Sequence, residues 1–291
     1  MLPALDTIEG LARESGELER GARSRPGAPA PPAVALRGVS FAYPGADGDT
    51  LHGVDLEIPA GTSATLVGTN GAGKTTLIRL MCGLYRPRIG TVTVDGVDLR
   101  ELDLERWHGD IAAMFQEFAR LPASVAENVG AGAVERLSDL DAISEALDEA
   151  GALGFSSSLR DGLRTRLATW YAEGSDVSGG QWQRLAIARA LFSLSAGARF
   201  LVLDEPTSNL DTASEERLIH RLLDGTRGTC TTLLVTHRLG LARRTDRIFV
   251  IEGGRVVEAG KHEDLMALGG RYATAFDMQA SLYPLEDSPR G

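Results

Sequence analysis

The chain has 291 residues, of which 43% are hydrophobic, 24% charged and 5% aromatic, a composition typical of globular proteins. Its 40 acidic and 30 basic residues give a formal net charge of −10, which disfavours a broad nucleic-acid or anionic-membrane surface. No segment approaches the roughly 18–20 apolar residues of a membrane helix, and the start does not resemble a signal peptide. We therefore expect any membrane role to come through a partner.

The rarest residue types in the sequence are informative. Only two of the basic residues are lysines, Lys74 and Lys261. The two cysteines, Cys82 and Cys230, do not have the spacing of a metal site. We expect both thiols to be reduced and buried as small apolar side chains in an intracellular protein.

The first third of the chain predicts an N-terminal helix and a linker, followed by strands. Residues 1–22 carry a weak helical stripe, interpreted either as the end of a connecting helix or as a free solvated helix. Residues 23–33 are a proline-rich linker. Strands are predicted over Val34–Tyr43, Leu51–Ile58, Ala64–Val67 and Thr91–Val94, the last ending in an Asp-Gly hairpin turn, with a helix over Lys74–Cys82.

The rest of the chain predicts a helical insertion and a return to the core. Residues 117–175 have helical patterns, including Asp139–Ala150. Strand character returns at Phe200–Leu203, Thr232–Val235 and Arg247–Ile251, and Glu263–Ala280 looks helical. We expect an N-terminal helix and proline-rich linker at 1–33, one domain at 34–281 with a helical subdomain at about 117–190, and a C-terminal tail at 282–291.

The strongest local signal is a glycine-rich loop of the form G-x-x-x-x-G-K-T between a strand and a helix. Its glycines let several backbone N–H groups face one phosphate chain, and the helix start adds a partial positive charge. Lys74 supplies a full charge for the β- and γ-phosphates, and Thr75 a hydroxyl for Mg²⁺. The loop and its following residues are Gly68, Thr69, Asn70, Gly71, Ala72, Gly73, Lys74, Thr75 and Thr76.

A second signal is the buried strand Phe200–Leu203, which ends in Asp204 and Glu205. In P-loop nucleotide hydrolases an acid at this place holds Mg²⁺, and a second acid can polarise the attacking water. A strand that simply ends in polar residues is the alternative, and Lys74 argues against it.

A third signal, Ser178-Gly179-Gly180-Gln181 before a helical run at Leu185–Phe192, resembles the signature of the ATP-binding-cassette (ABC) family, with Val177 in the usual leucine place. A serine and two glycines at a helix start make a second anion site, although an ordinary serine cap is also consistent. The resemblance extends over about residues 34–280. It matches Tyr43 to the adenine-stacking aromatic, Gln116 to the Q-loop glutamine, Asp211 to the D-loop and His237 to the switch histidine.

The resemblance implies an α/β fold: a RecA-like P-loop core, an N-terminal antiparallel β subdomain and a helical signature subdomain. It implies ATP and Mg²⁺ as cofactors, Mg²⁺ being held by Thr75, Gln116 and Asp204. It also implies catalysis by Glu205, His237, Lys74 and Gln116. Ser178, Gly179, Gly180, Gln181 and Asp211 would reach the nucleotide of a second ABC ATPase domain, in a homodimer or heterodimer.

The implied function is an ATPase subunit that drives transport through a transmembrane permease at the cytoplasmic face of the membrane. The stretches Gly254–Gly260, Lys261–Leu265 and Gly269–Tyr272 resemble the end of exporter nucleotide-binding domains, which favours the exporter type. One departure is the stretch Trp170–Asp176, which has Glu173 but not the Gly-Glu-x-Gly pattern of many exporters. Two alternatives stay open: a soluble ABC ATPase acting on DNA or ribosomes, disfavoured by the acidic charge and single cassette, and a regulatory subunit that does not hydrolyse ATP.

Overall fold

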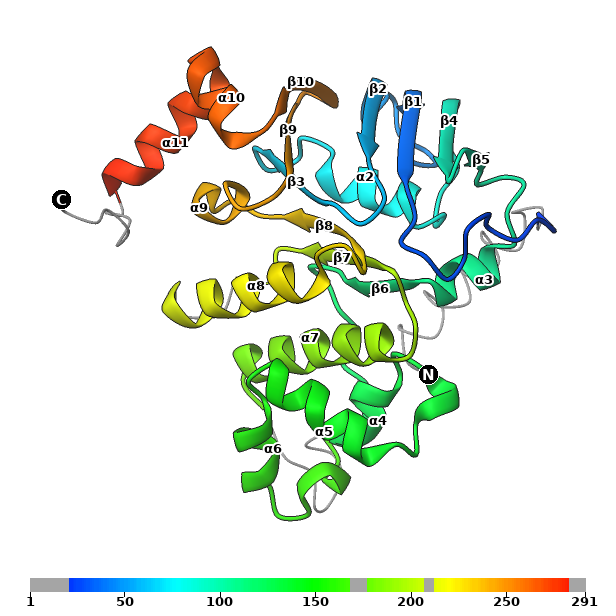
Figure 1. Ribbon diagram of the computed structural model, residues 1–291, viewed down its shortest axis with the longest axis vertical. Coiled ribbons are helices and arrows are strands. Elements are labelled where there is room, and N and C mark those ends of the chain that lie inside the picture. Colours follow the sequence, from blue (N-terminus) through cyan, green and yellow to red (C-terminus); the bar gives the residue numbers. More distant parts are fainter. Residues whose placement is uncertain (1–20, 168–176, 207–211, 283–291) are drawn as a thin grey trace.

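The computed structural model describes residues 21–167, 177–206 and 212–282, with the side chains of 212–217 left aside. Two sheets occupy the upper part of the molecule and a group of helices the lower part (Figure 1). The predicted stripe at 1–22 falls almost wholly outside the described residues. The Trp170–Asp176 stretch and Asp211 fall outside them entirely. The mixed α/β architecture confirms the predicted fold class.

The smaller sheet is antiparallel, and its strands run in the order β2-β1-β4-β5. Their bounds are Val34–Phe41 (β1), Leu51–Ile58 (β2), Ile89–Val94 (β4) and Val97–Asp98 (β5). The predicted turn is confirmed, since Asp95 and Gly96 both have positive φ, 50° and 77°. The first strand ends at Phe41, earlier than predicted, because Pro44 cannot donate to a ladder and Ala46 N–H bonds back to Tyr43.

The larger sheet carries the core of the protein, with strand order β10-β9-β3-β8-β7-β6. Its strands are β3 (Ser63–Gly68), β6 (Ile111–Met114), β7 (Phe200–Asp204), β8 (Thr231–Val235), β9 (Arg247–Glu252) and β10 (Arg255–Gly260). All pairings are parallel except that of β10 with β9. Every residue of β7 and β8 is buried, as expected of parallel strands covered on both faces.

The helices that contact this sheet include two where the sequence predicts one. They are α2 (Lys74–Met81), α3 (Leu104–Gly109), α8 (Thr212–Thr226), α9 (Leu239–Ala242), α10 (His262–Leu268) and α11 (Arg271–Leu282). The continuous helix expected over Glu263–Ala280 is broken at Gly269, which has φ 64° and ends α10 in the left-handed conformation. The carboxylate of Glu258 then accepts the N–H groups of Arg271 and Tyr272 and starts α11.

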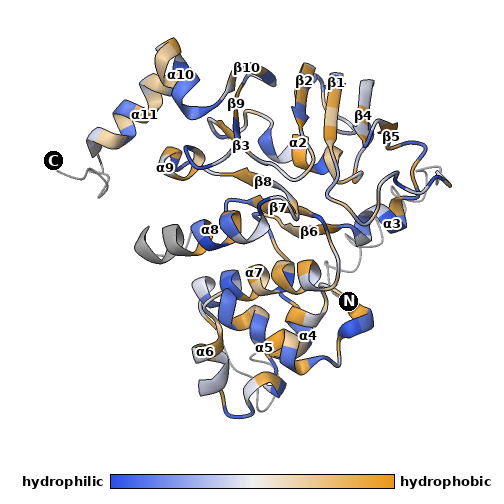
Figure 2. Cartoon of the chain, viewed as in Figure 1, coloured by the Kyte–Doolittle hydropathy of each residue, from blue (hydrophilic) through white to orange (hydrophobic). Residues whose placement is uncertain are grey.

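The helical part lies between β6 and β7 in the chain, as predicted. It comprises α4 (Val125–Gly130), η1 (Val134–Arg136), α5 (Leu140–Glu149), α6 (Leu153–Ser158), η2 (Gly162–Arg164) and α7 (Gly179–Ser195). Leu185, Ile187 and Phe192 of α7 are fully buried, together with Ile143 and Leu147 of α5. Helix α7 therefore carries hydrophobic residues on most of its surface, since helices lie below it and the sheet above (Figures 1 and 2).

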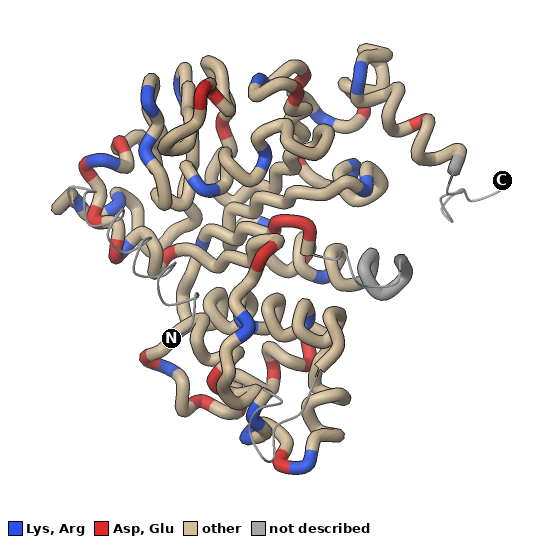
Figure 3. Tube along the Cα trace, turned by 180° about the vertical axis from the view of Figure 1, so that it is seen from behind, with Lys and Arg blue, Asp and Glu red and all other residues tan. Residues whose placement is uncertain are grey.

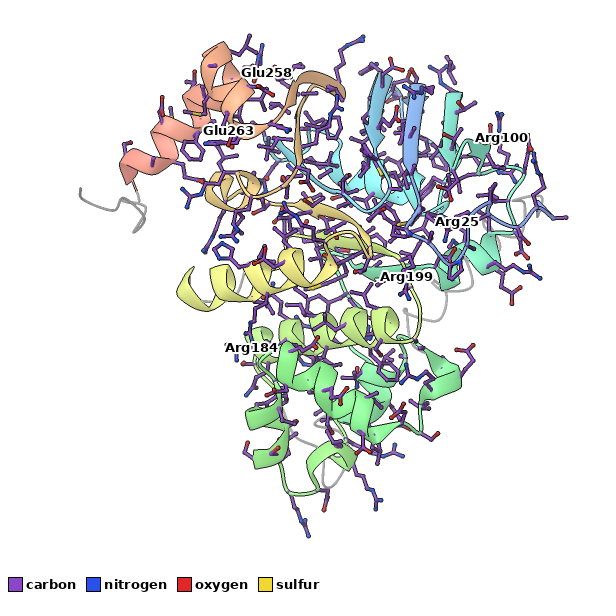
Figure 4. All side chains as sticks on the ribbon, in the orientation of Figure 1. Arg25, Arg100, Arg184, Arg199, Glu258 and Glu263 are labelled. Carbon is purple, nitrogen blue, oxygen red and sulfur yellow. The ribbon has the colours of Figure 1, made fainter. Side chains whose placement is uncertain are left out.

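Residues 21–33 lie against the domain instead of standing apart from it. Arg25 is 3% exposed and bonds to Asp95 at 2.8 Å and Asp110 at 2.9 Å, and Figure 4 places its label close to α3. Arg23 pairs through its backbone with Glu101 and Asp103. The stretch is thus fixed by specific contacts.

Both cysteines are buried as predicted, and one histidine, His262, contacts aromatic side chains. Cys82 and Cys230 are free and buried, and burial raises their pKa values to about 12 and about 11. His262 is half-buried, with Nδ1 2.9 Å from the Tyr272 hydroxyl and its ring against Phe276. Burial lowers its pKa.

Along the chain, Lys and Arg positions are interspersed with Asp and Glu positions in both parts of the molecule, as the view from behind shows (Figure 3). Among the described helices, none has the length and apolarity needed to cross a membrane.

Candidate nucleotide site

The predicted site residues come together because three parallel strands end at the same level. Leu66 of β3 pairs with Val235 of β8, and Val235 pairs with Asp204 of β7. The glycine-rich loop, the acidic pair and His237 follow these three strand ends. This edge also lies where the order of the sheet reverses about β3, the usual place of a ligand in an open α/β sheet.

The glycine-rich loop needs its glycines for two different reasons. Gly68 has φ 152°, and a Cβ there would lie 2.1 Å from the carbonyl oxygen of Ile251. Gly73, at the start of α2, has φ 104°, and a Cβ would lie 2.7 Å from Leu51 Cδ2. A larger residue would displace the loop from β9 or β2. The loop therefore has a fixed curvature that exposes Thr69, Asn70 and Gly71.

Lys74 folds back over this loop. Its Nζ donates to the carbonyl oxygens of Gly68 at 2.8 Å and Thr69 at 2.9 Å. The residue is only 6% exposed. Burial lowers the pKa of Lys74, while the charges of Glu205 and Asp204 act in the opposite direction. The ammonium group is thus held beside the loop with acidic groups close by, where it can contact a phosphate.

Asp204 and Thr75 form the part of the site that fits Mg²⁺. The Thr75 hydroxyl donates to Asp204 Oδ2 at 2.9 Å, while Asp204 Oδ1 is buried without a hydrogen-bond partner. Burial raises the pKa of this carboxyl. A buried, unpaired carboxylate oxygen beside a hydroxyl is a pair of hard oxygen ligands that suits Mg²⁺.

Glu205 and His237 are in direct contact. Glu205 Oε1 lies 2.6 Å from His237 Nε2, and the two side chains are 18% and 42% exposed. Glu205 has φ 50°, unusual for a residue with a side chain, and its N–H donates to Val235 O at 2.9 Å. The strand pairing thus holds a strained backbone that turns this carboxylate toward the switch histidine.

Tyr43 lies beside the loop and contacts the helix that follows it. Its hydroxyl is 3.0 Å from Thr76 Oγ1 and accepts a hydrogen bond from Arg79 at 3.2 Å. Its ring makes edge contacts with Phe41 and Tyr85. The ring is half-buried, so its orientation is fixed while part of its surface stays accessible.

The signature residues lie elsewhere in the chain's fold. Ser178 caps α7 in a capping box, its hydroxyl accepting from Gln181 N–H and Gln181 Oε1 accepting from Ser178 N–H. The cap role considered from the sequence is confirmed. Ser178 and Gly179 are exposed, and α7 lies on the opposite side of the parallel sheet from α2 (Figure 1).

Gln116 and Asp211 are the predicted site residues that remain. Gln116 is exposed in the segment after β6, and Asp211 lies outside the described residues. The local sequence patterns predict neither the Glu205–His237 contact nor the position of Gln183, which is buried on α7 with Nε2 3.5 Å from Glu205 O. Both depend on the spatial order of strands, for which the local patterns carry no signal.

A P-loop after β3 at the switch point of a parallel sheet, with a carboxylate pair at the end of β7, two strands away from β3, defines the P-loop nucleoside-triphosphatase fold. Residues 51–208 match the family model described as ABC transporter. The chain belongs to the ABC transporter family.

Its relatives include curated transport proteins. The chain is 39% identical over 280 residues to an ATP-dependent lipid A-core flippase of Chromobacterium violaceum, covering 96% of the chain and 46% of that protein. It is 34% identical over 254 residues to the subtilin transport ATP-binding protein SpaT of Bacillus subtilis, covering 87% and 41%. The chain spans less than half the length of these relatives.

A solved structure shares the fold closely. A bacterial Atm1-family ABC exporter with ATP bound superposes with a TM-score of 0.79 at 29% identity, covering 95% of this chain and 47% of that one.

Proposed function

We propose that this chain is the ATP-binding and ATP-hydrolysing part of an ABC exporter. The observation that carries the proposal is the contact between Glu205 and His237 beside Asp204 and Lys74 at one edge of the sheet. A nucleotide-binding domain that had lost hydrolysis would not need to keep a carboxylate and an imidazole together at this place. This argues against the regulatory alternative.

ATP binding uses the loop and the aromatic beside it. The N–H groups of Gly71, Ala72 and Gly73 and the start of α2 receive the phosphates, with Lys74 exchanging its two loop carbonyls for phosphate oxygens. Tyr43 stacks on the adenine. Thr75 and Asp204 would hold Mg²⁺, with Gln116 as a further ligand, and the ion would supply charge neutralisation for the β- and γ-phosphates.

In the hydrolysis step the chain's own groups move one proton and stabilise charge. Glu205 accepts a proton from the attacking water while the water oxygen forms a bond to the γ-phosphorus. The bond from that phosphorus to the ADP oxygen breaks. His237 and Lys74 donate hydrogen bonds to the phosphate oxygens on which charge develops. The products are ADP and inorganic phosphate.

A second cassette completes each site. The exposed start of α7 presents Ser178, Gly179, Gly180 and Gln181, with Asp211, to the nucleotide of the facing domain. Support comes from the position of α7 across the sheet from α2, which separates the two anion sites of one chain. The pair is a homodimer or a heterodimer of related domains.

The transmembrane partner and the cytoplasmic face of the membrane follow from the relatives. The flippase and the subtilin transport protein are both more than twice as long as their matched regions. A membrane-spanning part of the same or a separate polypeptide would receive the closing motion through the helical part. Residues 1–33 would precede the domain at 34–281 as its connection to that part.

The test is phosphate release from MgATP by the purified chain, compared with Lys74→Ala. We expect turnover that saturates with ATP in the unmodified chain. Both this turnover and the ATP binding measured by calorimetry should be lost in the variant. Lys261→Ala is the matched control, since Lys261 is exposed at the N-cap of α10 and should leave turnover unchanged. Binding without turnover by the unmodified chain would favour a regulatory subunit. Copurification of the chain with a membrane protein tests transport against a soluble role.

A further inference from the structure

One side chain of the C-terminal helix α11 holds both ends of the segment His237–Leu239, which we call the switch segment. Gln279 of α11 donates through Nε2 to the carbonyl oxygen of His237 at 2.9 Å. Its Oε1 accepts the backbone N–H of Leu239, the first residue of α9, at 2.7 Å. A single amide therefore bridges the three residues that carry the switch histidine into the next helix.

The switch segment needs this support. Helix α9 has only four residues, and its N-cap, Arg238, makes no side-chain capping bond. The Leu239 N–H is therefore one of the helix-start donors that have no acceptor within the helix, and Gln279 Oε1 supplies its acceptor. The His237 side chain is 42% exposed, so packing contributes little to fixing it.

Helix α11 is anchored firmly at its other end. The Glu258 carboxylate accepts from the N–H groups of Arg271 and Tyr272, and Figure 4 places Glu258 beside α10 and α11. Tyr272 is 1% exposed and packs in one apolar cluster with Leu265 and Leu239. Gln279 is thus presented to the switch segment by a helix whose start is fixed to β10.

We propose that Gln279 is a positioning residue for hydrolysis, which holds the backbone of His237 so that Nε2 faces Glu205 and the γ-phosphate. The proposal rests on the role proposed above for His237. It makes turnover dependent on the docking of α11, an element that carries none of the predicted nucleotide-binding or metal-binding residues. Displacing the end of α11 would release the switch histidine without altering the phosphate loop.

The test compares Gln279→Ala and Gln279→Glu with the unmodified chain in steady-state ATP hydrolysis. Alanine favours helix, so α11 should persist. Loss of both hydrogen bonds should lower kcat about tenfold and change KM for ATP less than about twofold, because the loss concerns the reacting state only. Glutamate keeps the acceptor for Leu239 but loses the donor to His237, and should lower kcat by about threefold.

Hydrogen exchange supplies a readout that a general loss of stability would not give. The Leu239 amide should exchange faster in Gln279→Ala and stay protected in Gln279→Glu, with exchange in β3 and β8 unchanged in both. Met278→Ala is the control, because Met278 is 63% exposed on the same helix turn and should leave kcat and Leu239 exchange as they are.

His237→Ala separates this proposal from the one on which it rests. If His237→Ala keeps full turnover, the role of His237 is wrong and Gln279 has nothing to position. If His237→Ala loses turnover while Gln279→Ala keeps a kcat within twofold, or loses affinity instead of kcat, the role of Gln279 is overturned.

Discussion

His237 Nε2 lies 2.6 Å from Glu205 Oε1, although 31 residues separate them in the sequence. The contact spans the adjacent ends of β7 and β8, where Asp204 pairs with Val235. The acid proposed to activate water and the histidine proposed to face the phosphate are therefore held as one unit. Any change in the register of these two strands would separate them.

Glu205→Gln tests the acid in this unit. A glutamine keeps the size of the side chain but cannot accept a proton from water, so turnover should fall about 10²- to 10⁴-fold, the usual contribution of a general base. ATP binding should persist, and MgATP should shift the protein to a dimer in light scattering.

Glu105→Gln is the matched control, because Glu105 is exposed on α3, and it should behave as the unmodified chain. Full turnover in Glu205→Gln would remove this residue from the catalytic role.

Ser178→Arg and Lys74→Ala together test the sharing of sites between copies. Each variant alone should be inactive. The arginine at position 178 blocks the face of the signature that receives the phosphate, and the alanine at position 74 removes the positive charge that binds the phosphates. In a homodimer, an equal mixture should recover about a quarter of normal turnover, because half of the dimers contain one intact site out of two.

A second capping box gives the control for Ser178. Ser124 caps α4 with Glu127 in the same manner. Ser124→Arg should cost a cap, about 1 kcal/mol of stability, without loss of turnover. A mixture that stays inactive would contradict a homodimer with shared sites.

Asp204→Asn tests the buried carboxylate through pH. Burial raises the pKa of Asp204 above its usual 3.8. Between pH 3.8 and the raised pKa, the folded chain binds more protons than the unfolded one. The contribution of Asp204 to the free energy of unfolding is therefore lost as pH rises through that range. Without nucleotide, Asp204→Asn should therefore raise Tm at pH 8, by about 2–4 °C for each 1 kcal/mol, and flatten the decline of stability that begins above pH 3.8.

Asp246→Asn should have the opposite sign. Burial opposes it, but hydrogen bonds from Ser63 lower the pKa of Asp246, so its stabilisation is present at neutral pH and lost as pH falls through the lowered value. Calorimetric scans at several pH values measure both variants. A lower Tm for Asp204→Asn at pH 8 would show that the carboxylate has a stabilising partner.

Arg25→Ala tests the fixed stretch before β1. Removing the arginine leaves Asp95 and Asp110 facing each other without their common cation, so the free energy of unfolding should fall by about 2–3 kcal/mol, less than for fully buried pairs because both acids are partly exposed. Arg23→Ala is the control, since Arg23 and Glu101 form an exposed pair that should contribute under about 1 kcal/mol. Denaturant unfolding measures both, and equal effects would contradict a specific role for Arg25.

The sequence by itself determined the pieces of the site. The loop from Gly68 to Lys74 requires glycine conformations that few other residues adopt, and the apolar run before Asp204 predicts a buried strand that ends in acids. Such signals are local, since φ preferences and strand periodicity act within a few residues. The helical break at Gly269 was missed because a capping carboxylate from β10 decides where α11 begins.

Only the tertiary structure decided which pieces meet. The order of strands in the larger sheet sets Glu205 against His237, Thr75 against Asp204, and Gln279 against the switch segment. These contacts join residues far apart in the chain, and they depend on parallel register and on the docking of α11 against β10. Register is set by the burial of whole strands and helices, so no short stretch of sequence contains it.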